Sequence, residues 1–163
     1  MFKYLVWFLT YHYETSEIMG FDEVFVNIVD KYYVTGEATW VNPTVLENMI
    51  KKVNRIRPML IGQIAPNMIM MDTLEQLKSL YDIKANYTII LFWDPDCGHC
   101  KKEIGHIKKL YTELKDSLGL EFFAVCSDTS MAKWKKKLHE YEMPWINVDG
   151  PRTITTNYHT LYD

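Results

Sequence analysis

The sequence has few cysteines, no excess of positive charge and no long hydrophobic run. Its three cysteines are too few for a disulfide scaffold, and their odd number leaves one thiol over after a single pair has formed. The formal net charge of −3 lacks the basic excess that favours binding to nucleic acid, so we expect no nucleic-acid partner. No apolar stretch approaches the roughly 20 residues that cross a bilayer. We therefore expect no membrane span in this chain.

What the chain does have is enough apolar residues to build a folded core. Of its 163 residues, 48% are hydrophobic and 14% are aromatic, which argues against disorder and fits one domain or a domain with an appended piece. Residues 1–9 begin like a signal peptide, but polar residues follow soon and no small-residue cleavage site is present. We therefore expect this segment to form a helix of the folded protein and any export signal to lie upstream.

Residues 1–58 have the periodicity of helices. Apolar residues recur at helical spacing over residues 2–9, 21–32 and 45–53. Gly36 suits the end of the second segment and Pro58 the end of the third. Asn42 and Pro43 suit the N-cap and the first position of the third helix. The sequence thus predicts an N-terminal helical segment over residues 1–58.

The pattern changes at about residue 60, where strands begin to alternate with helices. Strands are predicted over residues 68–71, 87–93, 121–126 and 144–148, and helices after Cys97 up to Gly119 and over 131–141. Residues 73–85 form a polar, mixed stretch. Alternation at this spacing favours right-handed parallel βαβ units. The predicted fold class is therefore α/β over residues 60–163, preceded by the helical segment.

The motif Cys97-Gly98-His99-Cys100 lies between the apolar strand 87–93 and an amphipathic helix. Two thiols at positions i and i+3 in the first turn of a helix can close into a disulfide and reopen by exchange. The unpaired N–H groups of that turn also stabilise an attacking thiolate. In this setting the motif predicts a redox centre made of Cys97 and Cys100.

Two other interpretations of the cysteine pair stay open. The pair could form a static disulfide in a non-catalytic interaction module, or it could bind a metal. A zinc site needs two more ligands, for which Cys126 and His106 are loose candidates. Cys126 lies in an apolar strand, however, so we expect it to be a core residue. Haem attachment is excluded because Lys101, and not histidine, follows the second cysteine. The peroxidatic pattern PxxxTxxC fits neither Cys97 nor Cys100.

Several short motifs follow one another after residue 60. They are Gly62-x-x-Ala65-Pro66, a strand ending in Phe92-Trp93, the CxxC at a helix start, Val125-Cys-Ser-Asp128, and Trp134 before Pro144-Trp-Ile-Asn-Val148. In this order the motifs resemble the TlpA-like branch of the thioredoxin superfamily, in particular the AhpC/TSA-type redoxin domains of Bacteroidetes. The resemblance implies a thioredoxin-like sheet and a thiol–disulfide oxidoreductase.

The resemblance also implies a role for each residue around the motif. Cys97 would be the more exposed, attacking thiol, and Cys100 the resolving thiol that releases the reduced substrate. His99, between them, would be the polarising group that lowers the pKa of the attacking thiol. The rim of the active site would consist of Trp93, Asp94, Pro95 and Asp96.

Partners, cofactors and location follow from the same resemblance. The partners would be thiols or disulfides of other proteins, together with an upstream thiol electron donor. No metal, flavin or nucleotide cofactor is implied. The parent protein would lie outside the cytoplasm, in the periplasm or cell envelope. Residues 1–58 would be the tail of a helical domain that precedes the redoxin domain.

At the motif itself, the sequence departs from the pattern of thioredoxin in two ways. Leu91 stands where thioredoxin has a buried aspartate that assists proton transfer from the resolving thiol. Asp96 stands where thioredoxin has tryptophan, directly before the first cysteine. The carboxylates of Asp94 and Asp96 would oppose a thiolate at Cys97, so we expect only a moderate depression of its pKa.

The end of the sequence departs further. The family's cis-proline loop opens a β-hairpin and a final helix, but no proline follows Pro151 here. We therefore expect the domain over residues 60–163 to lack these elements and the chain to belong to a longer protein. A sheet without these strands exposes an unpaired edge. That edge and the helical segment are the surfaces through which we expect a homodimer to form.

Overall fold

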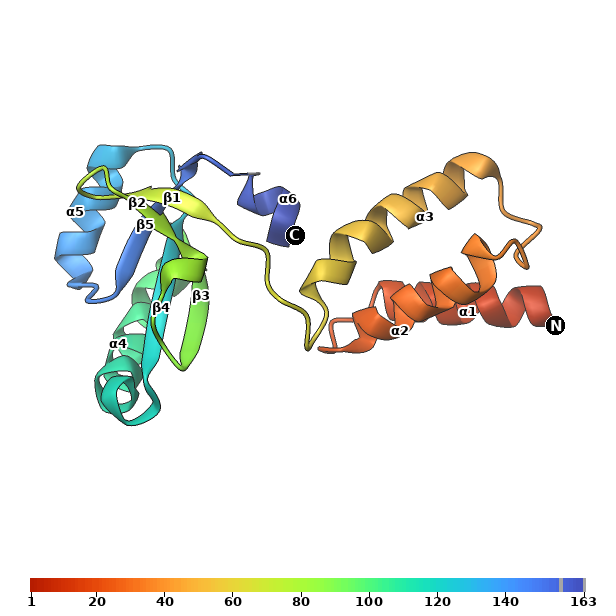
Figure 1. Ribbon diagram of the computed structural model, residues 1–163, viewed down its shortest axis with the longest axis horizontal. Coiled ribbons are helices and arrows are strands. Elements are labelled where there is room, and N and C mark those ends of the chain that lie inside the picture. Colours follow the sequence, from red (N-terminus) through yellow and green to blue (C-terminus); the bar gives the residue numbers. More distant parts are fainter. Residues whose placement is uncertain (156, 163) are drawn as a thin grey trace. The chain divides into compact units, whose positions relative to one another are not determined.

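The computed structural model describes residues 1–155 and 157–162. Its contacts divide the chain into two compact units, residues 1–66 with the end of the chain from residue 159, and residues 67–158 (Figure 1). The division falls after the boundary at residues 58–60 that the sequence predicts, and the assignment of residues 1–58 to an upstream domain stays a prediction. None of the helices in the described part is long and apolar enough to cross a membrane.

The first unit contains the three helices that the sequence predicts. Its elements are α1 (Phe2–Glu14), α2 (Phe21–Ile28), the π-helix η1 (Val29–Val34), α3 (Pro43–Ile56) and the 3-10 helix η2 (Arg57–Met59). The side chain of Asn42 accepts a hydrogen bond from the N–H of Val45 at 2.9 Å, which confirms the predicted N-cap of α3. The core of this unit includes Val6, Phe25 and Val53.

The second unit is a five-stranded sheet with helices between its parallel strands. Its elements are β1 (Ile69–Asp72), β2 (Leu77–Ser79), the 3-10 helix η3 (Leu80–Asp82), β3 (Tyr87–Trp93), α4 (Gly98–Leu118), β4 (Leu120–Cys126), α5 (Met131–Tyr141) and β5 (Ile146–Thr153). The short helix α6 (Tyr158–Tyr162) starts at the last residue of this unit, and the rest of it is assigned to the first unit. The strand order is β2-β1-β5-β4-β3. β3, β4 and β5 are parallel, whereas β1 is antiparallel to both its neighbours. The predicted α/β thioredoxin-like sheet, preceded by helices, is confirmed.

Two strands differ from the sequence prediction. β2 forms within the polar stretch 73–85, because the Asp72 carboxylate accepts hydrogen bonds from the N–H groups of Leu74 and Gln76 and closes a hairpin with β1. β5 starts at Ile146 and continues past the predicted end to Thr153. Its pairing with β1 shifts between Met70 and Met71, whose partners are Thr153 and Asp149. Residues 150–152 bulge there, so Pro151 fits an interior strand although it has no N–H to donate.

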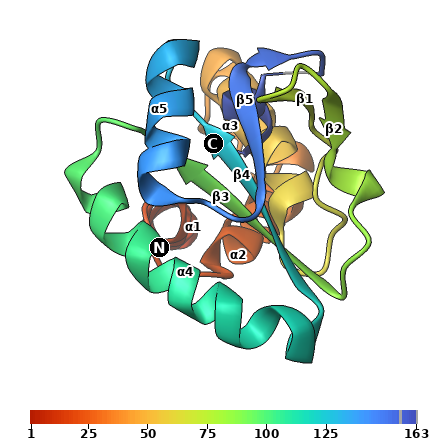
Figure 2. The same ribbon diagram turned by 90° about the vertical axis from the view of Figure 1, so that its left-hand side faces the viewer.

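The core of the second unit lies between the sheet and the helices α4 and α5. These two helices lie on the same side of β3, β4 and β5 (Figure 2). The core includes Trp93, Ile104, Phe122, Ala124, Cys126, Trp134 and Trp145. Cys126 is fully buried, as the sequence predicts, and burial raises the pKa of its thiol to about 12. Cys126 is therefore a core residue of the strand that follows the CxxC helix.

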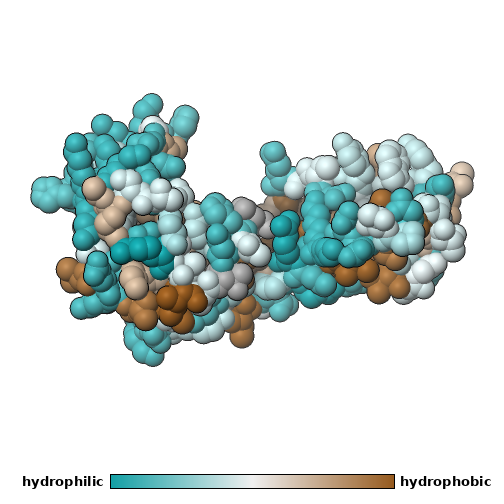
Figure 3. All heavy atoms as spheres, turned by 90° about the horizontal axis from the view of Figure 1, so that it is seen from above, coloured by the Kyte–Doolittle hydropathy of each residue, from teal (hydrophilic) through white to brown (hydrophobic). Residues whose placement is uncertain are grey.

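The surface of both units carries hydrophobic as well as hydrophilic residues (Figure 3). β3, the most apolar strand of the sequence, is among the exposed elements. Tyr87 is 61% exposed and Ile89 42% exposed, because β3 pairs with β4 and with no other strand among the residues that the structure describes. The CxxC motif thus follows a strand at the border of the described sheet.

Candidate active site

The turn between β3 and α4 places Cys97 at the N-cap of α4. The carboxylate of Asp94 accepts a hydrogen bond from the N–H of Asp96 at 2.7 Å, and the carbonyl of Asp94 accepts one from the N–H of Cys97 at 3.1 Å. These two bonds close the turn and direct the sulfur of Cys97 over the first turn of the helix. There, Cys97 Sγ accepts a hydrogen bond from the N–H of Cys100 at 3.4 Å. The sulfur of Cys97 thus takes the place that a serine or aspartate oxygen usually takes at a helix N-terminus.

The two thiols of the motif differ in acidity. A hydrogen bond from the thiol of Cys100, followed by the one from its backbone N–H, lowers the pKa of Cys97 below its ordinary value. Desolvation raises the pKa of Cys100, and a charge on the neighbouring Cys97 raises it further. All three cysteines of the chain are unpaired in the structure. The arrangement therefore favours a thiolate at Cys97 and a protonated thiol at Cys100.

His99 contributes to this asymmetry through its backbone. Its N–H donates to Cys97 and lowers the pKa of that thiol, while the side chain of His99 is exposed. Helical N–H groups act in this way whatever the side chain is. The role that the sequence predicts for the imidazole stays a prediction.

Acidic groups surround the motif as the sequence predicts. The carboxylate of Asp94 raises the pKa of both Cys97 and Cys100 and thus opposes a thiolate. Leu91, at the position of the buried thioredoxin aspartate, packs against the core. The described residues do contain a buried acid, Asp149 on β5, which pairs with Arg152 at 2.6 Å. The carboxylate that contributes to the raised pKa of Cys100, however, is that of Asp94.

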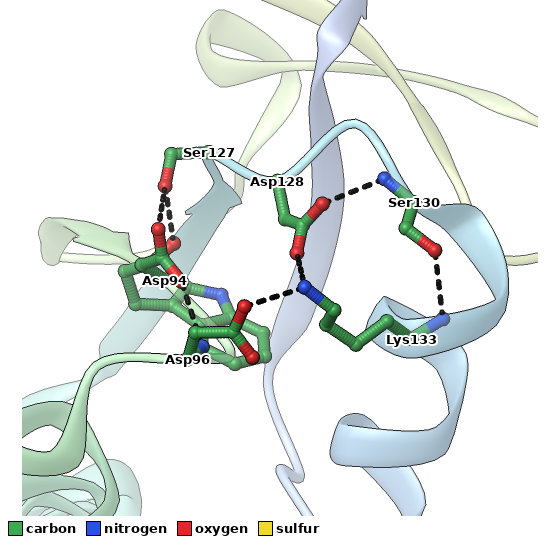
Figure 4. Close-up of polar contacts among 7 residues, drawn as sticks. Asp94, Asp96, Ser127, Asp128, Ser130 and Lys133 are labelled. Atoms are coloured by element: carbon green, nitrogen blue, oxygen red, sulfur yellow. Dashed lines mark hydrogen bonds and ion pairs between the residues drawn. The ribbon is translucent and has the colours of Figure 1, made fainter.

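A lysine from α5 joins the turn before Cys97 to the loop after β4 (Figure 4). The ammonium group of Lys133 lies 2.5 Å from Asp96 and 2.7 Å from Asp128. The hydroxyl of Ser127 donates to the carbonyl of Trp93 at 3.3 Å and lies 3.5 Å from the carboxylate of Asp94. The ion pair lowers the pKa of Asp128 and raises that of Lys133. We call Lys133, with Asp96 and Asp128, the Lys133 bridge.

The predicted rim residues occupy different depths. Trp93 is only 2% exposed and lies in the core, where its ring meets the edge of Tyr141. Pro95 is buried, Asp94 is half-buried and Asp96 is exposed. Asp94 and Asp96 thus border the motif at the surface, whereas Trp93 and Pro95 support it from below.

Lys133 and Asp128 are the residues that the sequence does not single out for the site. One signal was available: the carboxyl ends of adjacent parallel strands meet at one edge of a sheet, so the residues after β4 must approach those after β3. That signal leads to Ser127 and Asp128. No sequence pattern shows which lysine of α5 reaches them.

The structure also bears on which residues could hold a metal ion. Among the described residues, the group whose ligand atoms lie within 4.8 Å of one another consists of Asp94, Asp96 and Asp128. The thiols of Cys97 and Cys100 do not belong to this group. The ammonium of Lys133 already pairs with two of its carboxylates, so the positive charge at this place comes from the protein itself.

Comparison with known proteins places this site in a family. Residues 61–163 match the AhpC/TSA family, which accounts for more than half of the chain. The chain belongs to the AhpC/TSA family. The sequence-based assignment to the thioredoxin superfamily is thereby confirmed.

Curated relatives of this AhpC/TSA family member include thiol-disulfide oxidoreductases named ResA. The ResA of Bacillus cereus is 29% identical over 101 residues, which cover 61% of this chain and 58% of the relative. The ResA of Bacillus anthracis is 28% identical over the same share of each chain. The match thus spans less than two thirds of the curated relatives' length.

Solved structures that are similar to this AhpC/TSA family member include two from other bacteria. A domain described as a possible thiol-disulfide isomerase of Cytophaga hutchinsonii is 33% identical, with a TM-score of 0.52, and the match covers 55% of this chain and 61% of that one. A thioredoxin-like protein of Bacteroides caccae has a TM-score of 0.66 at 19% identity, covering 78% of this chain and 46% of that one. The similarity to the Bacteroides caccae protein shows the fold alone. Because it covers 78% of this chain, it includes residues outside the segment 61–163.

Proposed function

We propose that this protein exchanges disulfides with other proteins through Cys97 and Cys100. The observation that carries the proposal is the asymmetry of the two thiols: Cys97 accepts hydrogen bonds at the N-terminus of α4 and has a lowered pKa, whereas the pKa of Cys100 is raised. A thiolate is the attacking species in disulfide exchange, and the neighbouring thiol stays protonated until it resolves the mixed disulfide. Membership of the AhpC/TSA family and the names of the ResA relatives support the same chemistry.

The reaction follows from the two thiols. The thiolate of Cys97 attacks one sulfur of a target disulfide, the target S–S bond breaks, and the other target sulfur leaves as a thiolate that takes up a proton. Cys100 then loses its proton and attacks Cys97 Sγ, which releases the second target sulfur. The target has gained two electrons, and the protein holds a Cys97–Cys100 disulfide. A thiol electron donor restores the two thiols, and exchange in the opposite direction oxidises the target.

The neighbours of the thiols have supporting roles in this proposal. The backbone N–H groups of His99 and Cys100 stabilise the thiolate of Cys97. The imidazole of His99, when protonated, would add a positive charge beside it. Asp94 is the candidate to take up the proton of Cys100, since its carboxylate acts on the pKa of that thiol. Asp96, Trp93 and Pro95 shape the turn.

We further propose the setting in which this chemistry takes place. The partners are thiols or disulfides of proteins outside the cytoplasm and an upstream thiol donor, in line with the sequence resemblance. Residues 1–58 belong to a helical domain before the redoxin domain. Neither metal nor organic cofactor takes part in the exchange. The exposed edge of β3 and the helical segment are the candidate surfaces for a homodimer.

Trapping of mixed disulfides tests the proposed function with matched variants. Cys100→Ser keeps the attacking thiol and removes the resolving one, so it should accumulate a covalent complex with a disulfide-bonded substrate such as insulin. Cys97→Ser should trap far less, because the remaining thiol has a raised pKa. Cys126→Ala serves as the control that leaves both site thiols in place. Equal trapping by the two serine variants, or none by either, would contradict the proposal and favour a static disulfide or a metal-binding thiol pair.

A further inference from the structure

The Lys133 bridge includes the residue that directly precedes the attacking cysteine in the sequence. Its two ion pairs join elements that are distant in sequence: Asp96 belongs to the turn before α4, Asp128 to the loop after β4, and Lys133 to the first turns of α5. Asp96 immediately precedes Cys97. A lysine that neutralises Asp96 therefore acts on the electrostatic surroundings of Cys97.

The neighbouring loops fix Lys133 in this position. The hydroxyl of Ser130 accepts a hydrogen bond from the backbone N–H of Lys133 at 3.4 Å and caps α5. The carboxylate of Asp128 accepts one from the N–H of Ser130 at 2.8 Å and pairs with the Lys133 ammonium through its other oxygen. Trp134, the next residue, is almost fully buried and fixes the rotation of α5 against the sheet. Lys133 is thus presented to the turn by a capped helix and not by a freely moving segment.

Carboxylates dominate the turn and the loop next to the motif when this lysine is left out. The titratable groups of the surrounding elements are Asp94 and Asp96 in the turn, Asp128 in the loop after β4, His99, Cys100 and Lys101 in the first turn of α4, and Lys133 in α5. Carboxylates beside a thiol disfavour its ionised form, and a cation that pairs with them offsets this effect. Lys133 is a cation that pairs with two of these carboxylates.

We propose that Lys133 is a positioning residue for disulfide exchange: it holds the turn that carries Cys97 against the loop after β4, and it offsets the carboxylates that oppose the thiolate. This rests on the proposed role of Cys97 as the attacking thiol. Asp128 is the anchor of the bridge and at the same time one of the opposing charges. Removing Lys133 and removing the charge of Asp128 must therefore have opposite effects on Cys97.

The test measures how fast iodoacetamide alkylates Cys97 at pH values from roughly 5 to 10, the range in which thiols titrate. Mass spectrometry identifies the residue that has been modified. Lys133→Gln should raise the pKa of Cys97 and slow its alkylation at neutral pH roughly threefold, as expected for one lost charge at the protein surface. Asp128→Asn should accelerate it by a similar factor. Both effects should shrink at high salt.

Matched controls lie on the same helix. Lys137 pairs with Glu140 at 2.7 Å, so Lys137→Gln and Glu140→Gln change the net charge in the same way as the two test variants and break an ion pair of α5. Both control variants should change the alkylation rate of Cys97 by less than about twofold, as expected for a general change in the charge of the protein. Equal effects in test and control variants would overturn the proposal.

The opposite signs separate the proposal from a merely structural role. If Lys133 had only a structural role, removing either partner of the ion pair would loosen the turn, and Lys133→Gln and Asp128→Asn would both slow the alkylation of Cys97. That result would overturn the proposal that Lys133 acts through its charge. If Lys133→Gln does not fold, Asp128→Asn decides alone: acceleration supports the proposal, and slowing or no change refutes it. Alkylation needs no protein substrate. A failed trapping experiment with intact alkylation effects would therefore refute the exchange function, while the effect of Lys133 on the reactivity of the Cys97 thiol would still hold.

Discussion

At the scale of single residues, the chemistry depends on where each thiol lies relative to α4. Cys97 is at the N-cap, where N–H groups point at its sulfur, and Cys100 lies one turn further, half-buried, where desolvation raises its pKa. Cys126 lies at the end of the interior strand β4 and is fully buried. Three residues of one type thus have three different acidities because of position alone.

This ordering predicts the outcome of thiol counting. With a water-soluble disulfide reagent at pH 8, Cys97 should react first and Cys126 should stay unmodified, because burial raises its pKa to about 12 and blocks access. After unfolding in urea, all three thiols should react at similar rates. Mass spectrometry of the native and unfolded protein gives the count. Rapid modification of Cys126 in the native protein would contradict the buried strand that the structure shows.

The sequence predicts a redox role for Cys97 and Cys100, because their motif lies between a strand and a helix, and it predicts the burial of Cys126, because that residue lies in an apolar strand; both are local signals. It does not predict the partners of Asp96. The Lys133 bridge depends on how far α5 is rotated on the sheet, and that rotation is set by the packing of Trp134 in the core. Side-chain contacts between distant loops leave no periodic trace in a sequence.

At the scale of elements, the parallel strands and the helices between them follow from the hydrophobic pattern. β4 carries nearly continuous apolar residues and packs in the interior of the sheet, as its sequence predicts, whereas β5 is interior but contains several polar residues. β2 and the second half of β5 were not predictable in this way. β2 is a short, polar edge strand, and the end of β5 contains a bulge around Pro151.

Two glycines allow a test of this packing. A Cβ at Gly150, in β5, would lie 2.6 Å from the carbonyl oxygen of Cys126 and from the ring of Tyr158, so Gly150→Ala should destabilise the sheet unit by about 1–3 kcal/mol. A Cβ at Gly105, in α4, meets nothing within 4 Å. Gly105→Ala should therefore stabilise the protein by up to about 1 kcal/mol. Urea unfolding of both variants measures the difference, and a neutral Gly150→Ala would show that β4 and β5 are less closely packed there than described.

At the scale of the whole molecule, the helical unit and the sheet unit carry different information about function. The sheet unit contains the cysteine pair, the acidic turn and most of the match to the AhpC/TSA family. In the helical unit, α3 begins after the Asn42 cap with Pro43 in its first turn, as the sequence predicts, but the helices contain no residue pattern that indicates a reaction. Amphipathic periodicity is enough to predict secondary structure and fold class, whereas the prediction of a function depends on residues with specific chemistry.

The central claim is that Cys97 and Cys100 form one exchange centre, and a single turnover tests it most directly. The fully reduced protein is mixed with an equimolar peptide disulfide, the reaction is stopped with acid, and the disulfides are mapped by peptide mass spectrometry. We expect the peptide to be reduced and a Cys97–Cys100 disulfide to appear in equal amount, with Cys126 still a free thiol. A reduced peptide without this disulfide, a bond to Cys126, or no reaction at all would contradict it.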